Sequence, residues 1–229
     1  MPPTIQLTGA DATTTGDFSN ASMRISFSVV HLLSAATFSR TTGAIEAANA
    51  GKPLGDFWDD LQAQALAVVL TAVAGLEAFA NELFVDHAEV FPELRLEVMA
   101  KLWELYEQKP ILEKYEFALL LRQGKPFDRG AHPYQDAVAL IKLRNALTHY
   151  KPEWSDQQIE HAKVSSALQY KASPSPFFPS SESLFPRAWA SHGSTQWAVR
   201  TVLTFIQAFE QQADIQSRIQ PYVARLNAL

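Results

Sequence analysis

Residues 63–80 read AQALAVVLTAVAGLEAFA, the most apolar run in the chain. Ala and Val dominate this run, and Gln64 and Glu77 are among its few polar residues. The run is about as long as the shortest membrane spans, but its composition favours a buried core helix. A helix that is apolar on nearly all sides belongs at the centre of a bundle. We therefore expect a long central helix over residues 57–87 and no contact with a membrane.

Helical segments flank this central run on both sides. Turn-forming residues at 51–55 and Pro152 separate the segments, because glycine and proline end regular structure. The sequence predicts an all-α fold, a bundle of about six to eight helices in one domain over residues 19–229. Residues 1–18 form an N-terminal arm, in which residues 4–8 alternate enough for a short strand. The expected helical segments are 19–48, 57–87, 91–107, 110–122, 134–150, 155–169 and 191–227, the last as one or two helices.

Residues 171–189 interrupt the helical pattern, and we call this segment the proline-rich strap. Four prolines alternate there with Phe177, Phe178, Phe185 and Trp189. A loop of this length is unusual in a compact domain. It is either a functional lid or a strap held on the core by its aromatic side chains, and we favour the second interpretation.

Composition restricts the possible functions. The chain has 229 residues, of which 47% are hydrophobic, and its formal net charge is −5 at pH 7. An acidic protein does not capture nucleic acid through a broad positive field, so any polyanion contact requires a local basic site. The absence of cysteine excludes disulfides, zinc–thiolate sites and cysteine nucleophiles. The N-terminal residues lack the regions of a signal peptide, and we expect a cytoplasmic protein.

The histidines give no sign of a metal site. His31, His87, His132 and His161 are scattered and have no metal-ligand spacing with carboxylates. We interpret each of them as a surface or capping residue, and we expect no metal and no cofactor.

Residues 139–151 read ALIKLRNALTHYK and place Arg144, Asn145 and His149 at the end of an apolar helix. An arginine and a histidine at this spacing are common by chance, but an adjacent asparagine makes the combination rare. Here the chain resembles the HEPN superfamily, all-α domains marked by Arg, a polar residue and a His four to six positions after the Arg. The segment 75–83, GLEAFANEL, is similar to a Glu-x-x-x-Asn-Glu segment of many members, with Glu77, Asn81 and Glu82 in those positions.

Helical geometry places the two charged motif residues on different sides. At 100° per residue, Arg144 falls inside the apolar stripe of its helix, where it requires a partner. Glu77 is the best carboxylate for it, and Asn81 could share the site; a purely structural ion pair is the alternative. His149 lies 140° away from Arg144. The length of the arginine, distortion of the last helical turn or a second subunit could bring the two together.

The resemblance implies metal-independent endoribonuclease activity. His149 would move the proton of a ribose 2′-hydroxyl or of the leaving 5′-oxygen, and Arg144 would neutralise the phosphoryl oxygens. Asn145 would orient the phosphate or the imidazole, and the product would be a 2′,3′-cyclic phosphate. Lys151 and Tyr150 are candidate substrate contacts, although a solvated lysine and a core tyrosine are the simpler interpretations. The family further implies a homodimer with a shared site, a toxin or defence role, and a nucleotidyltransferase-like antitoxin as partner.

Two other functions remain open. A non-catalytic HEPN-like module could bind a nucleotide or a protein, and it would expose Arg144 while His149 points away. A helical scaffold would close Arg144 off completely with Glu77. An endoribonuclease would instead show a positive cleft around His149 and Lys151 in a dimer.

Overall fold

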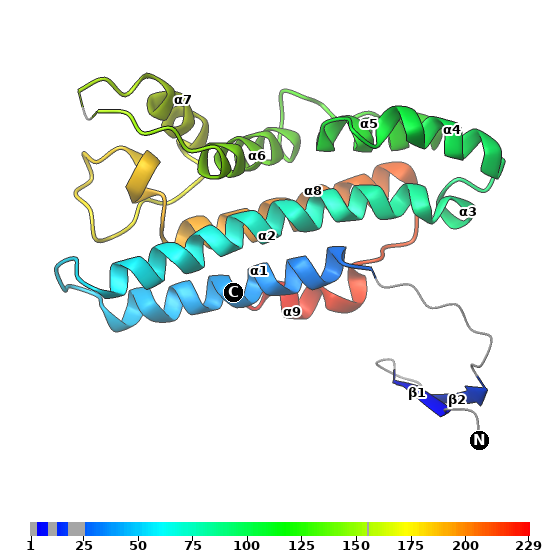
Figure 1. Ribbon diagram of the computed structural model, residues 1–229, viewed down its shortest axis with the longest axis horizontal. Helices are drawn as coiled ribbons and strands as arrows, with labels where there is room; N and C mark the ends of the chain where they lie inside the picture. Colours follow the sequence, from blue (N-terminus) through cyan, green and yellow to red (C-terminus); the bar gives the residue numbers. More distant parts are fainter. Residues whose placement is uncertain (1–3, 9–12, 18–25, 155) are drawn as a thin grey trace.

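A computed structural model describes residues 4–8, 13–17, 26–154 and 156–229. The fold is all-α, with a hairpin near the N-terminus (Figure 1). In the hairpin, β1 (Thr4–Thr8) pairs antiparallel with β2 (Thr13–Asp17). The predicted arm is described only in these two strands, and its remaining residues lie outside the described part of the chain.

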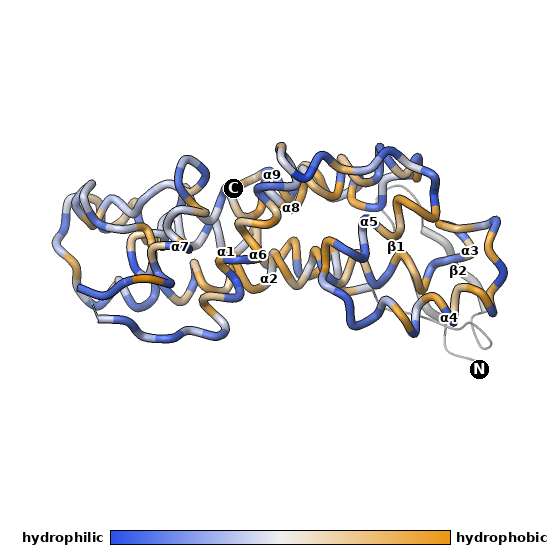
Figure 2. Tube along the Cα trace, turned by 90° about the horizontal axis from the view of Figure 1, so that it is seen from above, coloured by the Kyte–Doolittle hydropathy of each residue, from blue (hydrophilic) through white to orange (hydrophobic). Residues whose placement is uncertain are grey.

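Three long helices form the centre of the fold. They are α1 (Ser28–Ala48), α2 (Phe57–Val85) and α8 (His192–Ala213), and each contacts the other two. Figure 1 shows them side by side along the long axis, with α6 (Tyr134–Thr148) and α7 (Ile159–Leu168) over one half. The helices α4 (Leu96–Tyr106) and α5 (Ile111–Leu121) cover the other half. Figure 2 shows hydrophobic and hydrophilic residues along the same helices.

Helix α2 is the predicted central helix. Its buried side chains include Leu76 and Phe79, and it contacts helices on several sides. At Gly75 an added Cβ would lie 2.8 Å from Leu32 Cδ2, so a glycine there lets α1 approach closely. Among the helices that the structure describes, α2 is the one long and apolar enough to cross a membrane, and half of its most apolar stretch is buried within the fold. The core helix of a soluble protein has the same properties.

The first long helix begins later than the sequence indicates. Residues 26 and 27 are not helical, and α1 starts at Ser28, whereas we expected a helix from residue 19. Residues 18–25 lie outside the described residues. A carboxylate oxygen of Glu82 accepts hydrogen bonds from the backbone N–H groups of Phe27 and Ser28, both at 2.9 Å. This long-range cap, from a residue 54 positions away, fixes the start of the helix.

The described part of the chain has nine α-helices, more than the six to eight expected. The additional helices are short segments, too short for a periodic pattern of hydrophobic residues to show in the sequence. Residues 91–95 form turns, so α4 starts later than predicted. Helix α7 also starts later than predicted, and Glu153 accepts hydrogen bonds from the backbone N–H groups of Glu160 and His161 in its first turn. The short segments are α3 (His87–Val90), η1 (Leu184–Ala188), η2 (Gln220–Tyr222) and α9 (Val223–Asn227).

The proline-rich strap packs on the core. Phe177 lies against Phe57 with ring centroids 4.9 Å apart, and Phe178 meets Trp58 at 5.0 Å. Phe185 and Trp189 are fully buried. Aromatic side chains thus hold the strap in place, and burial of a large aromatic side chain supplies about 1.5–3 kcal/mol of stabilisation.

Candidate functional site

The Arg-Asn…His motif lies at the C-terminal end of α6. Ala137, Leu140 and Leu143 bury one side of this helix in the core. The helix ends at Thr148, and His149 follows with non-helical dihedral angles of φ −111° and ψ 40°. The ideal helical wheel therefore does not apply to His149. Its 140° separation from Arg144 is not fixed by helix geometry, because the last turn opens at this residue.

Arg144 and Glu77 form a loose pair between α6 and α2. Arg144 Nη2 lies 3.9 Å from Glu77 Oε2, and the side chains are 26% and 43% exposed. The Nε atom of Arg144 is buried and has no hydrogen-bond partner among the residues described. Glu77 thus faces Arg144 as expected, but it does not enclose the guanidinium. The arginine keeps donors available for another acceptor.

Asn81 does not join this pair, although we expected that it could share the site. Its Oδ1 accepts a hydrogen bond of 2.8 Å from Lys114 Nζ, and the ammonium also lies 5.5 Å from the ring centroid of Trp103. Burial lowers the pKa of Lys114, although the charges of Glu77 and Glu107 oppose this shift. Nothing in the local sequence singles out Lys114, because the pairing requires α5 to pack on α2.

Asn145 and His149 present free side chains. Both residues are exposed, and neither side chain has a hydrogen-bond partner in the part of the chain that the structure describes. The N–H of His149 donates to the carbonyl of Asn145 at 2.9 Å, and the hydroxyl of Thr148 donates to the carbonyl of Arg144 at 2.8 Å. These bonds use main-chain acceptors only, so both polar side chains remain available to a ligand.

The two residues after the motif differ in what they contact. The ring of Tyr150 stacks on His161, with centroids 5.4 Å apart and planes at 23°. The carbonyl of Lys151 lies 2.9 Å from His161 Nε2, whereas its side chain is exposed. Hydrogen bonds from the backbone N–H groups of His161 and Glu160 lower the pKa of Glu153. Tyr150 thus has a structural contact, but it is 47% exposed, so its interpretation as a core residue is wrong. Lys151 keeps a free ammonium near the motif.

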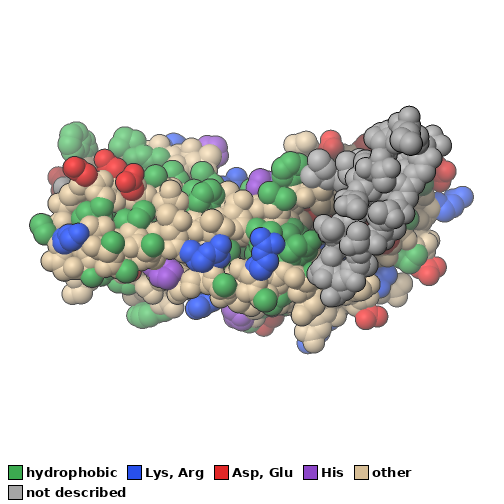
Figure 3. Space-filling model, turned by 90° about the horizontal axis from the view of Figure 1, so that it is seen from below, with side chains coloured by type: hydrophobic (Ala, Val, Ile, Leu, Met, Phe, Trp, Pro, Cys, Tyr) green, Lys and Arg blue, Asp and Glu red, His purple; other side chains and the backbone are tan. Residues whose placement is uncertain are grey.

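The motif lies on open surface in the single chain. None of the five main cavities over the described residues has Arg144, Asn145 or His149 in its wall. Figure 3 shows the opposite face, the one that carries α1 and α9, and Lys and Arg side chains lie singly on it. Within the described ranges, no group of three acidic or histidine side chains is placed to hold a metal ion. The positive cleft that an endoribonuclease dimer is expected to have is not among these five cavities of the single chain.

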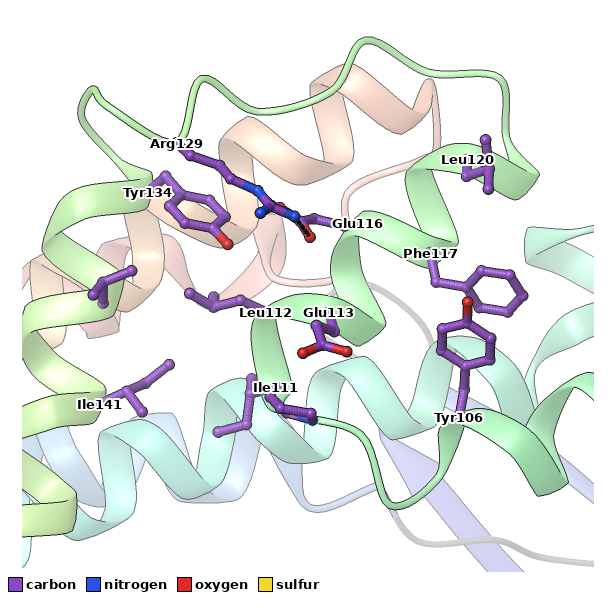
Figure 4. A pocket seen from close by; sticks show the side chains of 12 residues that line it. Tyr106, Ile111, Leu112, Glu113, Glu116, Phe117, Leu120, Arg129, Tyr134 and Ile141 are labelled. Carbon is purple, nitrogen blue, oxygen red and sulfur yellow. Dashed lines mark hydrogen bonds and ion pairs between the residues drawn. The ribbon is translucent and has the colours of Figure 1, made fainter.

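The largest of these cavities is a groove between α5 and α6, with a volume of about 550 Å³. Figure 4 shows apolar side chains around it, with the carboxylate of Glu113 between them. At one end Arg129 donates two hydrogen bonds to Glu116, at 2.7 and 2.6 Å. At the other end Tyr106 stacks on Phe117, with ring centroids 3.6 Å apart. The groove is thus apolar and carries one carboxylate without a partner in the described chain.

Sequence reasoning missed a second charged cluster. His132 and Lys171 both contact the carboxylate of Asp136, at the N-terminal end of α6. His132 and Asp136 are four positions apart and could have suggested a pair. Lys171 is 35 positions further along and could not.

The chain was also compared with known proteins. No family model, no curated protein and no solved structure matches it.

Proposed function

We propose that this protein is a HEPN-like, metal-independent endoribonuclease. The single observation that supports the proposal is the state of the motif at the end of α6. Asn145 and His149 carry free, exposed side chains, and Arg144 is paired only loosely, at 3.9 Å from Glu77. A fold that uses these residues only for stability would enclose and pair them, because unpaired buried charges are costly.

The chemistry follows from the three side chains. His149 accepts the proton of the ribose 2′-hydroxyl, which attacks the adjacent phosphorus and displaces the 5′-oxygen. A histidine also returns a proton to that leaving oxygen. The products are a 2′,3′-cyclic phosphate and a 5′-hydroxyl, and DNA is not a substrate because it lacks the 2′-hydroxyl. Arg144 neutralises the charge that builds on the phosphoryl oxygens, and Asn145 orients the phosphate.

A second copy of the chain completes the site in this proposal. One chain offers open surface at the motif, and water exclusion requires a cleft. A two-fold axis near the end of α6 would bring two motifs together, so that Arg144 of one copy and His149 of the other face one phosphate. Lys151 then adds a cation to the cleft. The resemblance extends the proposal to a cytoplasmic toxin or defence effector that a nucleotidyltransferase-like antitoxin restrains.

Cleavage of RNA in EDTA tests the proposal. The purified protein should cleave RNA and leave cyclic-phosphate ends, and His149→Ala should reduce the rate about 10²- to 10⁴-fold. His87→Ala is the matched control, because His87 lies on α3 and outside the motif. Absence of cleavage on several structured and unstructured RNAs at high protein concentration would refute the nuclease. Equal cleavage by the His149 variant would remove His149 from the mechanism.

The groove between α5 and α6 favours a second candidate, a protein-binding module. Its apolar walls and the exposed Leu120 at its edge, 71% exposed, suit apolar side chains of a partner. Glu113 repels phosphates and attracts a basic residue, which argues for a protein segment and against a nucleotide. The occupant in this candidate is an amphipathic helix with apolar residues and a Lys or Arg that meets Glu113.

Two designed peptides test this candidate. One is an amphipathic Leu/Lys helix, and the other has Glu in place of every Lys. The Lys peptide should bind in fluorescence anisotropy, and Glu113→Gln should weaken it severalfold. Glu104→Gln is the control, because Glu104 is an exposed acid on α4 that pairs with Lys101 outside the groove. Equal binding of both peptides, or no effect of Glu113→Gln, would exclude the groove as this site.

A further inference from the structure

A second cavity lies at the N-terminal end of α6, at the opposite end from the motif. It has a volume of about 310 Å³ and lies between α6, the residues that follow α7, and α8. His149 lies thirteen positions after Asp136, which corresponds to about 20 Å along a helix. The cavity is thus separate from the proposed nuclease site. Its lining includes His132, Asp136, Lys171, Gln196, Arg200 and Thr204.

Asp136 organises one wall of the cavity. His132 Nδ1 lies 2.8 Å from Asp136 Oδ2, and Lys171 Nζ binds the other carboxylate oxygen. Burial alone would raise the pKa of Asp136, but the hydrogen bonds from Lys171 and His132 lower it below its ordinary value. The carboxylate therefore stays ionised. It holds both partners in place and leaves Nε2 of His132 free.

Arg200 provides the facing charge. It lies on α8, it is exposed, and its guanidinium has no partner among the described residues. Two permanent cations, Lys171 and Arg200, thus line the cavity together with one carboxylate, and the cavity carries a net positive charge. Gln196 and Thr204 add neutral hydrogen-bond donors whose side chains are unused elsewhere in the described structure. The protein as a whole carries a net charge of −5, so the positive charge of this cavity is a local feature.

The cavity is built on rigid contacts. Hydroxyl groups of Ser191 and Ser194 donate to the carbonyl of Ser173, at 2.6 and 2.7 Å. An added Cβ at Gly193 would lie 2.7 Å from Ser173 Cβ, so the segment after α7 packs directly on the first turn of α8. These contacts join the segment that follows Lys171 to the helix that carries Arg200, so the space is formed before a ligand enters, which reduces the ordering cost of binding.

We propose that this cavity binds the phosphate group of a small phosphorylated metabolite, with Arg200 and Lys171 as its cationic contacts and His132 as a further donor. The planar guanidinium of arginine matches phosphate oxygens in a bidentate arrangement, and a lysine adds a point charge. A cavity of about 310 Å³ accommodates a sugar phosphate. It does not accommodate a helix, whose diameter is about 10 Å.

Calorimetric titration with ribose 5-phosphate tests this proposal on the full chain. Ribose 5-phosphate should bind, inorganic phosphate should bind more weakly, and ribose should not bind. Arg200→Gln should weaken binding of ribose 5-phosphate by about 10- to 100-fold, as expected for a hydrogen-bonded charge. Arg200→Lys should recover part of the affinity. Arg225→Gln is the matched control, because Arg225 is an exposed arginine on α9, away from the cavity.

Three results would overturn the proposal. The first is absence of binding at millimolar ribose 5-phosphate. The second is equal affinity for ribose 5-phosphate and inorganic phosphate, which would show that the cavity binds an anion and does not recognise the sugar. The third is RNA binding that Arg200→Gln weakens and that ribose 5-phosphate does not displace, because the cavity would then serve a nucleic acid. His132→Gln is a second variant, exposed enough to leave folding intact, and a fall in affinity there supports the proposed donor.

Discussion

At its N-terminal end, helix α6 meets ionisable side chains that are joined to one another, because Asp136 contacts both His132 and Lys171. At its C-terminal end the polar side chains are left free. Asn145 and His149 have no side-chain partners in the described structure, and Arg144 reaches Glu77 only at 3.9 Å. One helix thus carries a satisfied charge cluster and an unsatisfied one.

The difference between the two ends of α6 distinguishes residues that can stabilise the fold from residues that can act on another molecule. A charge cluster whose members neutralise one another can be retained for stability, and it needs no ligand to explain it. Exposed polar groups without partners contribute little to folding. If they have a role, it is toward a molecule outside the chain. The paired cluster acquires such a role only through Arg200, which faces the same cavity without a partner of its own.

The largest effect is expected from the middle of α6, which holds both ends in place. Leu140 is fully buried there. Leu140→Ala should lower the free energy of unfolding by about 2–5 kcal/mol, through lost burial and the cavity that remains. Urea denaturation at pH 7 measures this change, with Val138→Ala, an exposed position on the same helix, as the control. A loss below about 1 kcal/mol would show that α6 is not anchored through this residue.

A smaller effect is expected from breaking the paired end. Asp136→Asn should lower the free energy of unfolding at pH 7 by about 1–3 kcal/mol, because Lys171 loses its ionic partner. The pKa of Asp136 is lowered in the folded state from its ordinary value of 3.8. Its contribution is therefore present above that value and is lost as the pH falls through the folded pKa. The difference between wild type and variant should hold from pH 7 to about 5 and shrink below about 4.

Unfolding curves at several pH values measure this dependence. Asp156→Asn is the control, because Asp156 is exposed and has no ion pair in the described part of the chain. A difference that stays constant down to pH 3, or that grows on acidification, would contradict the pairing of Asp136.

The two ends of α6 also illustrate which features of the structure could be predicted from the sequence. The central helix was predictable because residues 63–80 are apolar on nearly all sides, and a helix of this kind packs at the centre of a helical bundle. The motif at Arg144 and His149 was visible because its members are close in sequence. Glu77 was predictable as the partner of Arg144, since it interrupts an apolar helix.

Apart from the pair of Glu77 and Arg144, contacts between distant segments were not predictable. Lys171 reaches Asp136 from 35 positions away, and Lys114 reaches Asn81 from 33. Glu82 caps α1 from 54 positions away, so the start of that helix could not be read from local capping residues. In each of these cases a polar side chain finds its partner only after the helices have packed, and local patterns carry no information about that choice.

A still smaller effect on stability is expected at Glu77. Glu77→Gln should change the free energy of unfolding by less than about 1 kcal/mol, because the pair is partly exposed and long at 3.9 Å. If the proposed nuclease site is correct, removal of this carboxylate should strengthen RNA binding severalfold at low salt. Glu104→Gln, on the exposed side of α4, is the control. A loss of several kcal/mol would indicate that Arg144 is a purely structural residue.

The smallest effect on stability is expected for the two exposed side chains at the C-terminal end of α6. Asn145→Ala and His149→Ala should each change the free energy of unfolding by less than about 0.5 kcal/mol, because no contact in the described structure is lost. Thermal and urea unfolding measure this directly. RNA cleavage by the same His149 variant should nevertheless fall at least about 100-fold. A protein that loses its activity while it keeps its stability uses the residue for chemistry. A variant that loses both would place His149 among the structural contacts of α6, and the contrast between the two ends of the helix would disappear.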